Sequence, residues 1–257
     1  MSIETTFDPA LHAVIDPATN HLRRDRKLDA LIINFSEKIM KALLEQDLLE
    51  LVEEKAIQCV SCTLNMYVFR GTNIGVIQTH VGAAFTASLV EDAAWSFSCD
   101  KIILFGSCGG LDRALTAGRL VVPTHAYRDE GVSYHYVPAA DYIEVKNHDV
   151  VASVMEKLNI PYVKGRCWTT DAFFRETRRN MERRKAEGCI AVDMELAAIQ
   201  AVCDFRGYQL YDFVYTGDNL DGEEWDEGIL TSIGLDERLL HFSIALEIAK
   251  TVTEVSL

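Results

Sequence analysis

A chain of 257 residues with 49% hydrophobic and 25% charged residues has the composition of a globular protein that can bury a sizeable core. Its formal net charge of −14 argues against nucleic acid as a partner, because such binding needs a basic stripe. No apolar run approaches the roughly 20 residues of a membrane helix. The first residues include Glu4 and Asp8 and lack the apolar stretch of a secretory signal. We therefore expect a cytoplasmic protein without membrane contact.

Apolar runs of strand length alternate with runs of helical spacing, after an irregular arm at residues 1–27. Strands are predicted at 29–33, 57–69, 74–79, 101–105, 119–123, 161–168 and 209–216. Helices are predicted at 37–51, from 83 to about 97, at 147–158, 175–187 and 194–206, and from about 235. Residues 124–146 are expected to form an extended excursion, and the charged helix 175–187 a solvated face. The alternation predicts an α/β fold with a largely parallel sheet, in a single domain spanning residues 1–257.

Seven cysteines are scattered along the chain, most of them in apolar runs, which favours buried reduced thiols. Cys59 and Cys62 have C-x-x-C spacing, but no second pair or histidine is near them in the sequence. They fall in a predicted strand, where the two side chains would point to opposite faces. We therefore expect core thiols and no metal site.

An apolar strand ends in Gly106-Ser107-Cys108-Gly109-Gly110, which predicts a glycine turn. Glycines accept positive φ and leave the backbone open to a ligand, and successive N–H groups can then cradle an anion beside the Ser107 hydroxyl. A tight turn without any ligand is the alternative.

A second informative segment, Asp193-Met194-Glu195, joins a strand end to a helix start. Asp193 is placed to cap the helix. Small apolar residues follow Glu195, so its carboxylate is expected in a crowded place where it needs partners, such as two vicinal sugar hydroxyls. The alternative is a second acidic residue that only complements the helix dipole.

A third segment carries the apolar strand 210–215 directly into Asp218. Ligands of open α/β sheets bind beyond the carboxyl ends of strands, so an Asp at this end is placed for proton transfer. The run Asp218–Gly222 is equally typical of a turn.

In their order and spacing, these three segments resemble the nucleoside phosphorylase family, which includes uridine phosphorylase and hexameric purine nucleoside phosphorylases and is related to methylthioadenosine/S-adenosylhomocysteine nucleosidases. The resemblance runs from about Leu28 to the last helix and includes Thr79–Gly82, Gly118–Val122 and Thr169–Phe173. It implies a three-layer domain whose twisted mixed, largely parallel central sheet is flanked by helices. It also implies a homo-oligomer, a dimer or trimer of dimers, with sites at the subunit interface.

The resemblance assigns roles by position. Asp218 would protonate a purine leaving group, and Met194 and Glu195 would bind the ribose, with His21 reaching a neighbouring subunit's 5′-hydroxyl. Phosphate would be held by Ser107, Gly106 and Lys38. The base-binding residues would be Cys108, Gly109, Phe173, Asp193 and Arg179.

The chain also departs from the family at the phosphate site. Lys38 stands where a phosphate-binding arginine is usual, and Leu104 takes the place of a second arginine. Thr177 replaces the glutamine that holds uracil, which favours a purine. Glu37 lies near the position of the glutamate that activates water in nucleosidases.

Three functions follow from the resemblance. The first expectation is a phosphorylase that cleaves the N-glycosidic bond of a nucleoside, with inorganic phosphate as co-substrate and no other cofactor. A phosphate-independent nucleosidase and a nucleoside-binding homologue without activity are the alternatives.

Overall fold

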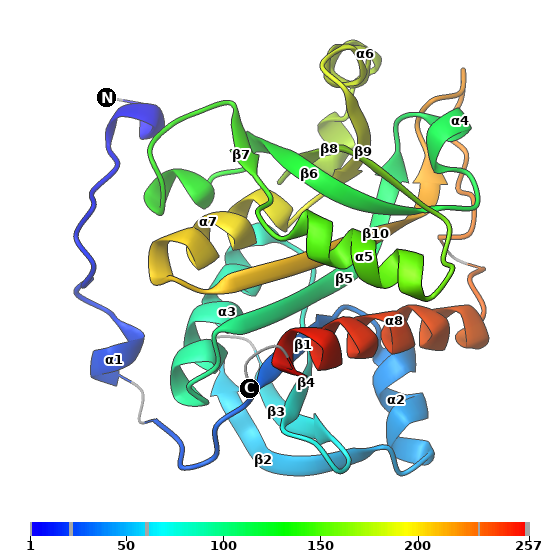
Figure 1. Cartoon of the computed structure of the whole chain (residues 1–257). Coiled ribbons are helices and arrows are strands. Elements are labelled where there is room, and N and C mark those ends of the chain that lie inside the picture. The colour runs from blue at the N-terminus through cyan, green and yellow to red at the C-terminus, as the bar shows by residue number, and fades with distance from the viewer. Residues whose placement is uncertain (1, 21–22, 60–61, 231, 255–257) are drawn as a thin grey trace.

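The computed structural model describes residues 2–20, 23–59, 62–230 and 232–254. Its strands form one ten-stranded mixed sheet in the order β10-β6-β8-β9-β5-β1-β4-β3-β2, with β7 paired to β6 (Figure 1). The strands are β1 (Ala30–Asn34), β2 (Leu49–Gln58), β3 (Thr63–Phe69), β4 (Ile74–Gln78), β5 (Lys101–Gly110), β6 (Leu120–Asp129), β7 (Tyr142–Glu144), β8 (Tyr162–Thr170), β9 (Cys189–Asp193) and β10 (Gln209–Asn219). The predicted mixed α/β class is confirmed.

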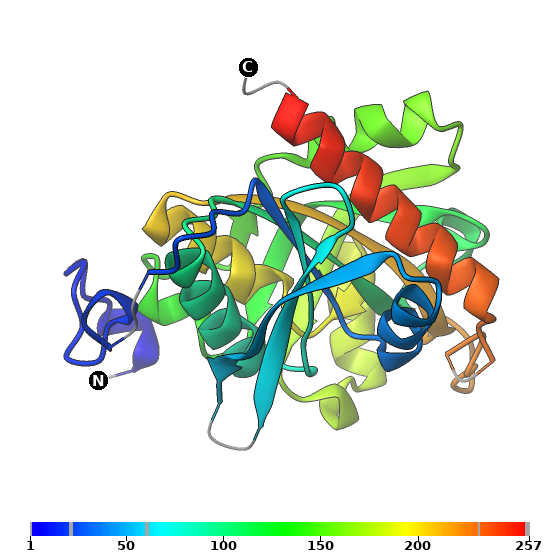
Figure 2. The same ribbon diagram turned by 90° about the horizontal axis from the view of Figure 1, so that it is seen from below.

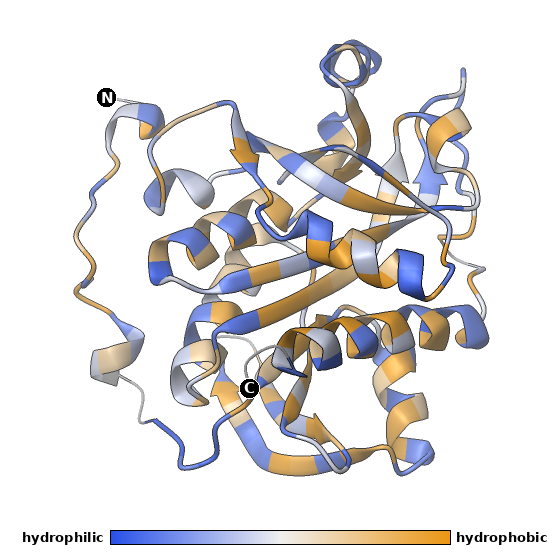
Figure 3. Cartoon of the chain, viewed as in Figure 1, coloured by the Kyte–Doolittle hydropathy of each residue, from blue (hydrophilic) through white to orange (hydrophobic). Residues whose placement is uncertain are grey.

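Helices cover both faces of the sheet (Figure 2). On one face, α3 (Ala83–Ser96) and α7 (Leu196–Arg206) share a hydrophobic core with the strands. On the other face, α2 (Glu37–Glu45), α5 (His148–Lys157) and α8 (Leu235–Glu254) enclose a second core. β5 runs between the two cores and is apolar along most of its length in Figure 3, as a strand buried on both faces must be. The other α-helices of the described residues are α1 (Pro17–Asn20), α4 (Arg113–Thr116) and α6 (Arg178–Ala186), and 3₁₀ turns lie at Ile3–Thr5, Ser133–His135 and Phe173–Arg175.

The sheet differs in detail from the central layer of a three-layer domain that the resemblance implied, because β10 also pairs with β5. This pairing closes β5, β10, β6, β8 and β9 into a ring. The closure depends on β5, which pairs with β1 from Ile102 to Leu104 and then with β9 at Gly109 and Gly110. Between Leu104 and Gly109, no described strand pairs with this edge of β5. The candidate site lies at this gap.

The glycine segment is the second half of β5 and not the predicted turn. Glycine is needed there because β10 and β9 approach closely. A Cβ atom on Gly109 would lie 2.7 Å from Leu220 Cδ1, and one on Gly110 would lie 2.7 Å from Asn219 Oδ1. The expected backbone cradle is therefore restricted to the gap between β1 and β9.

Two other predictions need correction near the start of the chain. The helix expected over 37–51 ends at Glu45, because Asp47 adopts a positive φ of 55° and the chain turns into β2. The strand expected over 57–69 is a hairpin of β2 and β3. Cys59 and Cys62 lie at its turn, where the Cys59 N–H donates to the Cys62 carbonyl at 2.9 Å, so the argument from opposite strand faces was wrong.

The extended excursion expected over 124–146 contains regular structure, since β6 continues to Asp129 and β7 pairs with it. Across the four described stretches of chain, none of the helices has the length and apolar character needed to span a bilayer.

Candidate active site

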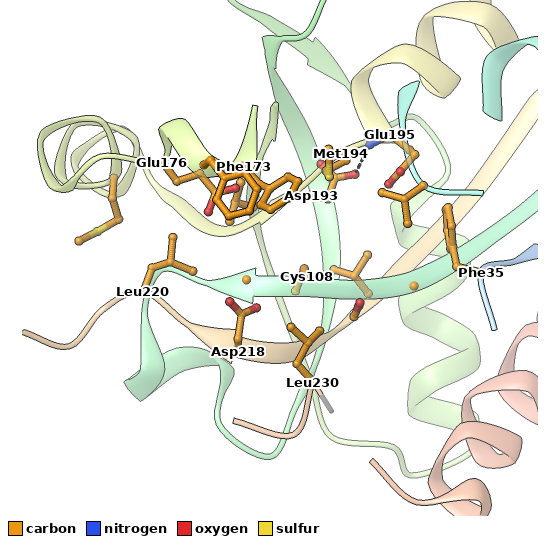
Figure 4. A pocket seen from close by; sticks show the side chains of 18 of the residues that line it. Phe35, Cys108, Phe173, Glu176, Asp193, Met194, Glu195, Asp218, Leu220 and Leu230 are labelled. Carbon is orange, nitrogen blue, oxygen red and sulfur yellow. Dashed lines mark hydrogen bonds between the residues drawn. The ribbon is translucent and has the colours of Figure 1, made fainter. Parts of the chain in front are cut away.

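A cavity of about 710 Å³ lies where β5, β9 and β10 meet (Figure 4). Ser107 of β5, Glu195 at the start of α7 and Asp218 of β10 all line it, although they are far apart in sequence. Strand pairing brings these segments together, because Ser107 lies opposite Tyr215 and Gly109 lies opposite Asp218 in the parallel ladder. The other lining residues are Phe35, Val81, Leu104, Gly106, Cys108, Gly109, Phe173, Phe174, Glu176, Arg178, Met181, Val192, Asp193, Met194, Asp212, Val214, Leu220, Trp225 and Leu230.

The wall at the start of α7 is held by Asp193. Its carboxylate accepts the Thr169 hydroxyl at 2.6 Å and the backbone N–H groups of Glu195 and Leu196 at 3.1 and 2.7 Å. These bonds satisfy donors that a helix N-terminus leaves free, so the predicted capping role is confirmed. They also fix the backbone from which Glu195 projects.

Glu195 is buried in this wall, with 8% of its surface exposed. One carboxylate oxygen accepts the Gly82 N–H at 2.5 Å. Gly82 has a φ of 117°, a conformation that glycine adopts without strain, and this conformation presents its N–H to Glu195. Burial, together with the negative charge of Asp193, raises the pKa of Glu195 to about 8. An ionised carboxyl group accepts hydrogen bonds from two paired hydroxyls, and the neutral form can also donate one.

Aromatic side chains and two carboxyl groups form the opposite end of the cavity. Phe173 and Phe174 contact each other with ring centroids 4.1 Å apart, and Phe173 is half exposed to the cavity. Figure 4 shows Phe173 beside Glu176, on the side of the cavity across from Asp218. Burial and the charge of Asp218 raise the pKa of Glu176 to about 7.

Asp218 is half-buried, and burial raises its pKa above the ordinary value. The indole N–H of Trp225 donates to Asp218 Oδ2 at 2.7 Å and opposes this rise. The loop that carries Trp225 is anchored by the Arg178 guanidinium, which donates to the carbonyls of Leu220 and Glu223. Asp218 is thus a carboxyl group whose orientation is fixed and whose affinity for a proton is increased.

The residues expected to bind phosphate come together only in part. Gly106 and Ser107 line the cavity, whereas Lys38 is exposed on α2 and is absent from its described lining. Leu104 does line it, and the Phe35 ring would lie 3.0 Å from a Cβ atom on Gly106. The corner expected for phosphate is therefore largely apolar.

Of the other expected residues, Met194, Cys108, Gly109 and Phe173 line the cavity. Arg179 is absent from the described lining, whereas its neighbour Arg178 lines the cavity. Arg178 is the one Lys or Arg side chain among the described lining residues. His21 lies outside the described residues.

Four lining residues whose side chains carry N–H groups or carboxyl oxygens were not anticipated from the sequence: Glu176, Arg178, Asp212 and Trp225. Asp212 had a signal, because a carboxylate inside the apolar run Leu210–Val214 is unusual. The others lie in polar segments, where nothing in the sequence separates a cavity residue from a solvated one. Within the described residues, no group of three His, Cys, Asp or Glu side chains is arranged to hold a metal ion.

Comparison with known proteins identifies the family of the chain. A sequence model described as "Phosphorylase superfamily" matches residues 29–238, which is most of the chain. The chain belongs to the phosphorylase superfamily. Its members that resemble this chain include a DeoD-type purine nucleoside phosphorylase of Buchnera aphidicola, 22% identical over 61% of this chain and 68% of the relative.

Solved structures share the fold at lower identity. The chain is similar to a purine nucleoside phosphorylase from Toxoplasma gondii in complex with immucillin-H, with a TM-score of 0.71, 18% identity and coverage of 91% and 94% of the two chains. It is also similar to an AMP nucleosidase from Bacteroides thetaiotaomicron, with a TM-score of 0.67, 17% identity and coverage of 89% and 90%. The solved structures that share this fold thus include one named as a phosphorylase and one named as a nucleosidase.

Proposed function

We propose that this protein cleaves the N-glycosidic bond of a purine nucleoside and releases the free base. The observation that carries the proposal is that Asp218 and Glu195 line one cavity, with Phe173 on the side across from Asp218 and the start of α7 forming the wall at Glu195. When the base stacks on Phe173, its ribose points toward Glu195, and Glu195 binds the 2′- and 3′-hydroxyls.

The chemistry follows from the two carboxyl groups. Cleavage leaves positive charge on the sugar and negative charge on the base, so the leaving base must be protonated as the bond breaks. Asp218 donates that proton to the purine N7, and burial keeps the proton available by raising the pKa of this carboxyl. Glu195 fixes the sugar so that the anomeric carbon faces the acceptor.

Phosphate is one candidate acceptor. Ser107 and Gly106 lie at the free edge of β5, where a hydroxyl and backbone N–H groups can hold an anion. In that case the products are the free base and ribose 1-phosphate. Water is the second candidate acceptor, and the apolar corner formed by Leu104 and Phe35 favours it over an anion.

Assembly belongs to the same proposal. The exposed aromatic residues Phe174 and Trp225 stand at the cavity and would be covered by a second copy of the chain in a homo-oligomer. His21 of a neighbouring copy would then reach the 5′-hydroxyl.

A panel of purine and pyrimidine nucleosides, incubated with the protein with and without phosphate, tests the proposal. Release of free base from a purine nucleoside, detected by chromatography, is the expected result. Ligand-induced thermal stabilisation without release of any base would instead indicate a nucleoside-binding homologue.

A further inference from the structure

Asp212 is a buried carboxyl group that the proposed chemistry does not yet use. It lies in the middle of β10, with 2% of its surface exposed, and it lines the cavity. Its Oδ2 atom is buried without a hydrogen-bond partner. A buried polar group without a partner is costly and is usually explained by a ligand, a water molecule or a catalytic task.

The strand register locates Asp212 at the corner where the sugar meets its acceptor. Asp212 lies opposite Leu104 in the parallel ladder, and Val214 lies opposite Gly106. Leu104, Leu210 and Val214 belong to the core on the α3 and α7 face, so Asp212 projects to the same face. Leu104 occupies the position that the resemblance gives to a phosphate-binding arginine, so the neighbouring strand carries a carboxyl group beside this position and no guanidinium is present there.

Other acidic groups surround Asp212. Asp193 and Glu195 face it from the start of α7, and the thiol of Cys108 lies close enough to be influenced by Asp193, Asp218 and Asp212 together. Asp193 uses its oxygens as acceptors for the α7 backbone and Thr169, and Glu195 binds the Gly82 N–H. Among the carboxylates of Asp193, Glu195 and Asp212, the Oδ2 atom of Asp212 is the buried oxygen that accepts no hydrogen bond.

We propose that Asp212 binds the water molecule that attacks the anomeric carbon, so that the acceptor in this enzyme is water and not phosphate. This inference rests on the proposed cleavage of a purine nucleoside. Water forms the new C1′–O bond as the C1′–N9 bond breaks, and the electrons of the broken bond go to the base. The water proton passes to Asp212, and the Asp218 proton passes to N7. The products are free ribose and free purine, and no further reactant is needed.

The surroundings of Asp212 suit a proton acceptor better than an anion site. Burial and the charges of Asp193 and Glu195 raise its pKa well above the ordinary value, which makes its ionised form a strong base. The ionised Asp212 carboxylate also repels a phosphate dianion. Arg178 is the cationic side chain of the described lining, and it already donates hydrogen bonds to the carbonyls of Leu220 and Glu223.

The test compares the wild-type protein with Asp212→Asn in phosphate-free buffer. Base release by the wild type is expected without phosphate, with ribose as the sugar product and ¹⁸O from labelled water at C1. Asp212→Asn should lower kcat by at least about 100-fold, the scale of a lost general base, and leave nucleoside affinity nearly unchanged. Asp149→Asn is the matched control, because Asp149 is exposed on α5 and pairs with Lys164.

Two further readouts separate a chemical role from a structural one. Asp212→Asn should keep or raise the thermal midpoint, because it removes a buried carboxyl group whose Oδ2 atom has no hydrogen-bond partner. In Asp212→Ala, sodium azide should restore base release and yield ribosyl azide, since an anionic nucleophile needs no base and the truncated side chain leaves room for it.

The outcomes distinguish the two proposals. Base release that requires phosphate and yields ribose 1-phosphate would overturn the role of Asp212 and leave the proposed function intact. A wild-type rate in Asp212→Asn without phosphate would do the same. If the wild type releases no base from any nucleoside, both proposals fail.

Discussion

Replacement of Asp218 by Asn tests the assignment of the acid. The amide keeps the shape of the side chain and can still accept the Trp225 N–H, but it carries no transferable proton. General acid catalysis contributes about 10²–10⁴-fold, which corresponds to about 3–5 kcal/mol of transition-state stabilisation. Because Asp218 is half-buried beside Trp225 and has a raised pKa, we expect a loss in the upper part of this range for a purine nucleoside.

The assay follows kcat for guanosine and for its 7-methyl derivative, whose base already carries positive charge and does not need protonation at N7. Asp218→Asn should lose activity on guanosine and retain most of it on the methylated nucleoside, with Asp149→Asn as the control variant. Equal losses on both substrates, or near-normal turnover of guanosine, would refute the role of Asp218 as acid.

Three further predictions concern the same site. Trp225→Phe removes the N–H that lowers the pKa of Asp218, so the pH above which kcat/KM for a purine nucleoside falls should move upward; an unchanged pH profile would count against this contact. Glu195 has a pKa raised from 4.5 to about 8 in the folded protein, so the folded state binds more protons than the unfolded state between these values. The free energy of unfolding should therefore fall as pH rises from 4.5 to 8, and urea denaturation of Glu195→Gln should show a flatter dependence. Lys38→Ala should leave kcat/KM unchanged with or without phosphate, because Lys38 is exposed and away from the described lining; a phosphate-dependent loss would contradict this placement.

Much of the fold could be predicted because the apolar runs of this chain are regular. The strands around Leu104 and Leu210 and the helix after Glu195 fall close to their predicted positions. Asp218 and Glu195 could also be identified, because Asp218 lies at the carboxyl end of β10 and Glu195 lies just beyond that of β9, and such strand ends converge in an α/β sheet.

Other features depend on contacts between distant segments. The run Gly106–Gly110 satisfies the local rules for a turn, but close packing against β9 and β10 keeps it extended. The ring closure by β5 and β10 is likewise a pairing that no local pattern encodes. Asp212 is unusual as a carboxylate within an apolar run, but only its register with Leu104 shows that its face of β10 meets the cavity.

A crystal structure of Asp218→Asn with bound guanosine is the most direct test of how the cavity is used. The purine should stack on Phe173 with N7 within hydrogen-bond distance of residue 218, and the 2′- and 3′-hydroxyls should contact Glu195. A nucleoside bound outside this cavity, or bound with its ribose at Phe173 and its base at Glu195, would contradict the proposed chemistry.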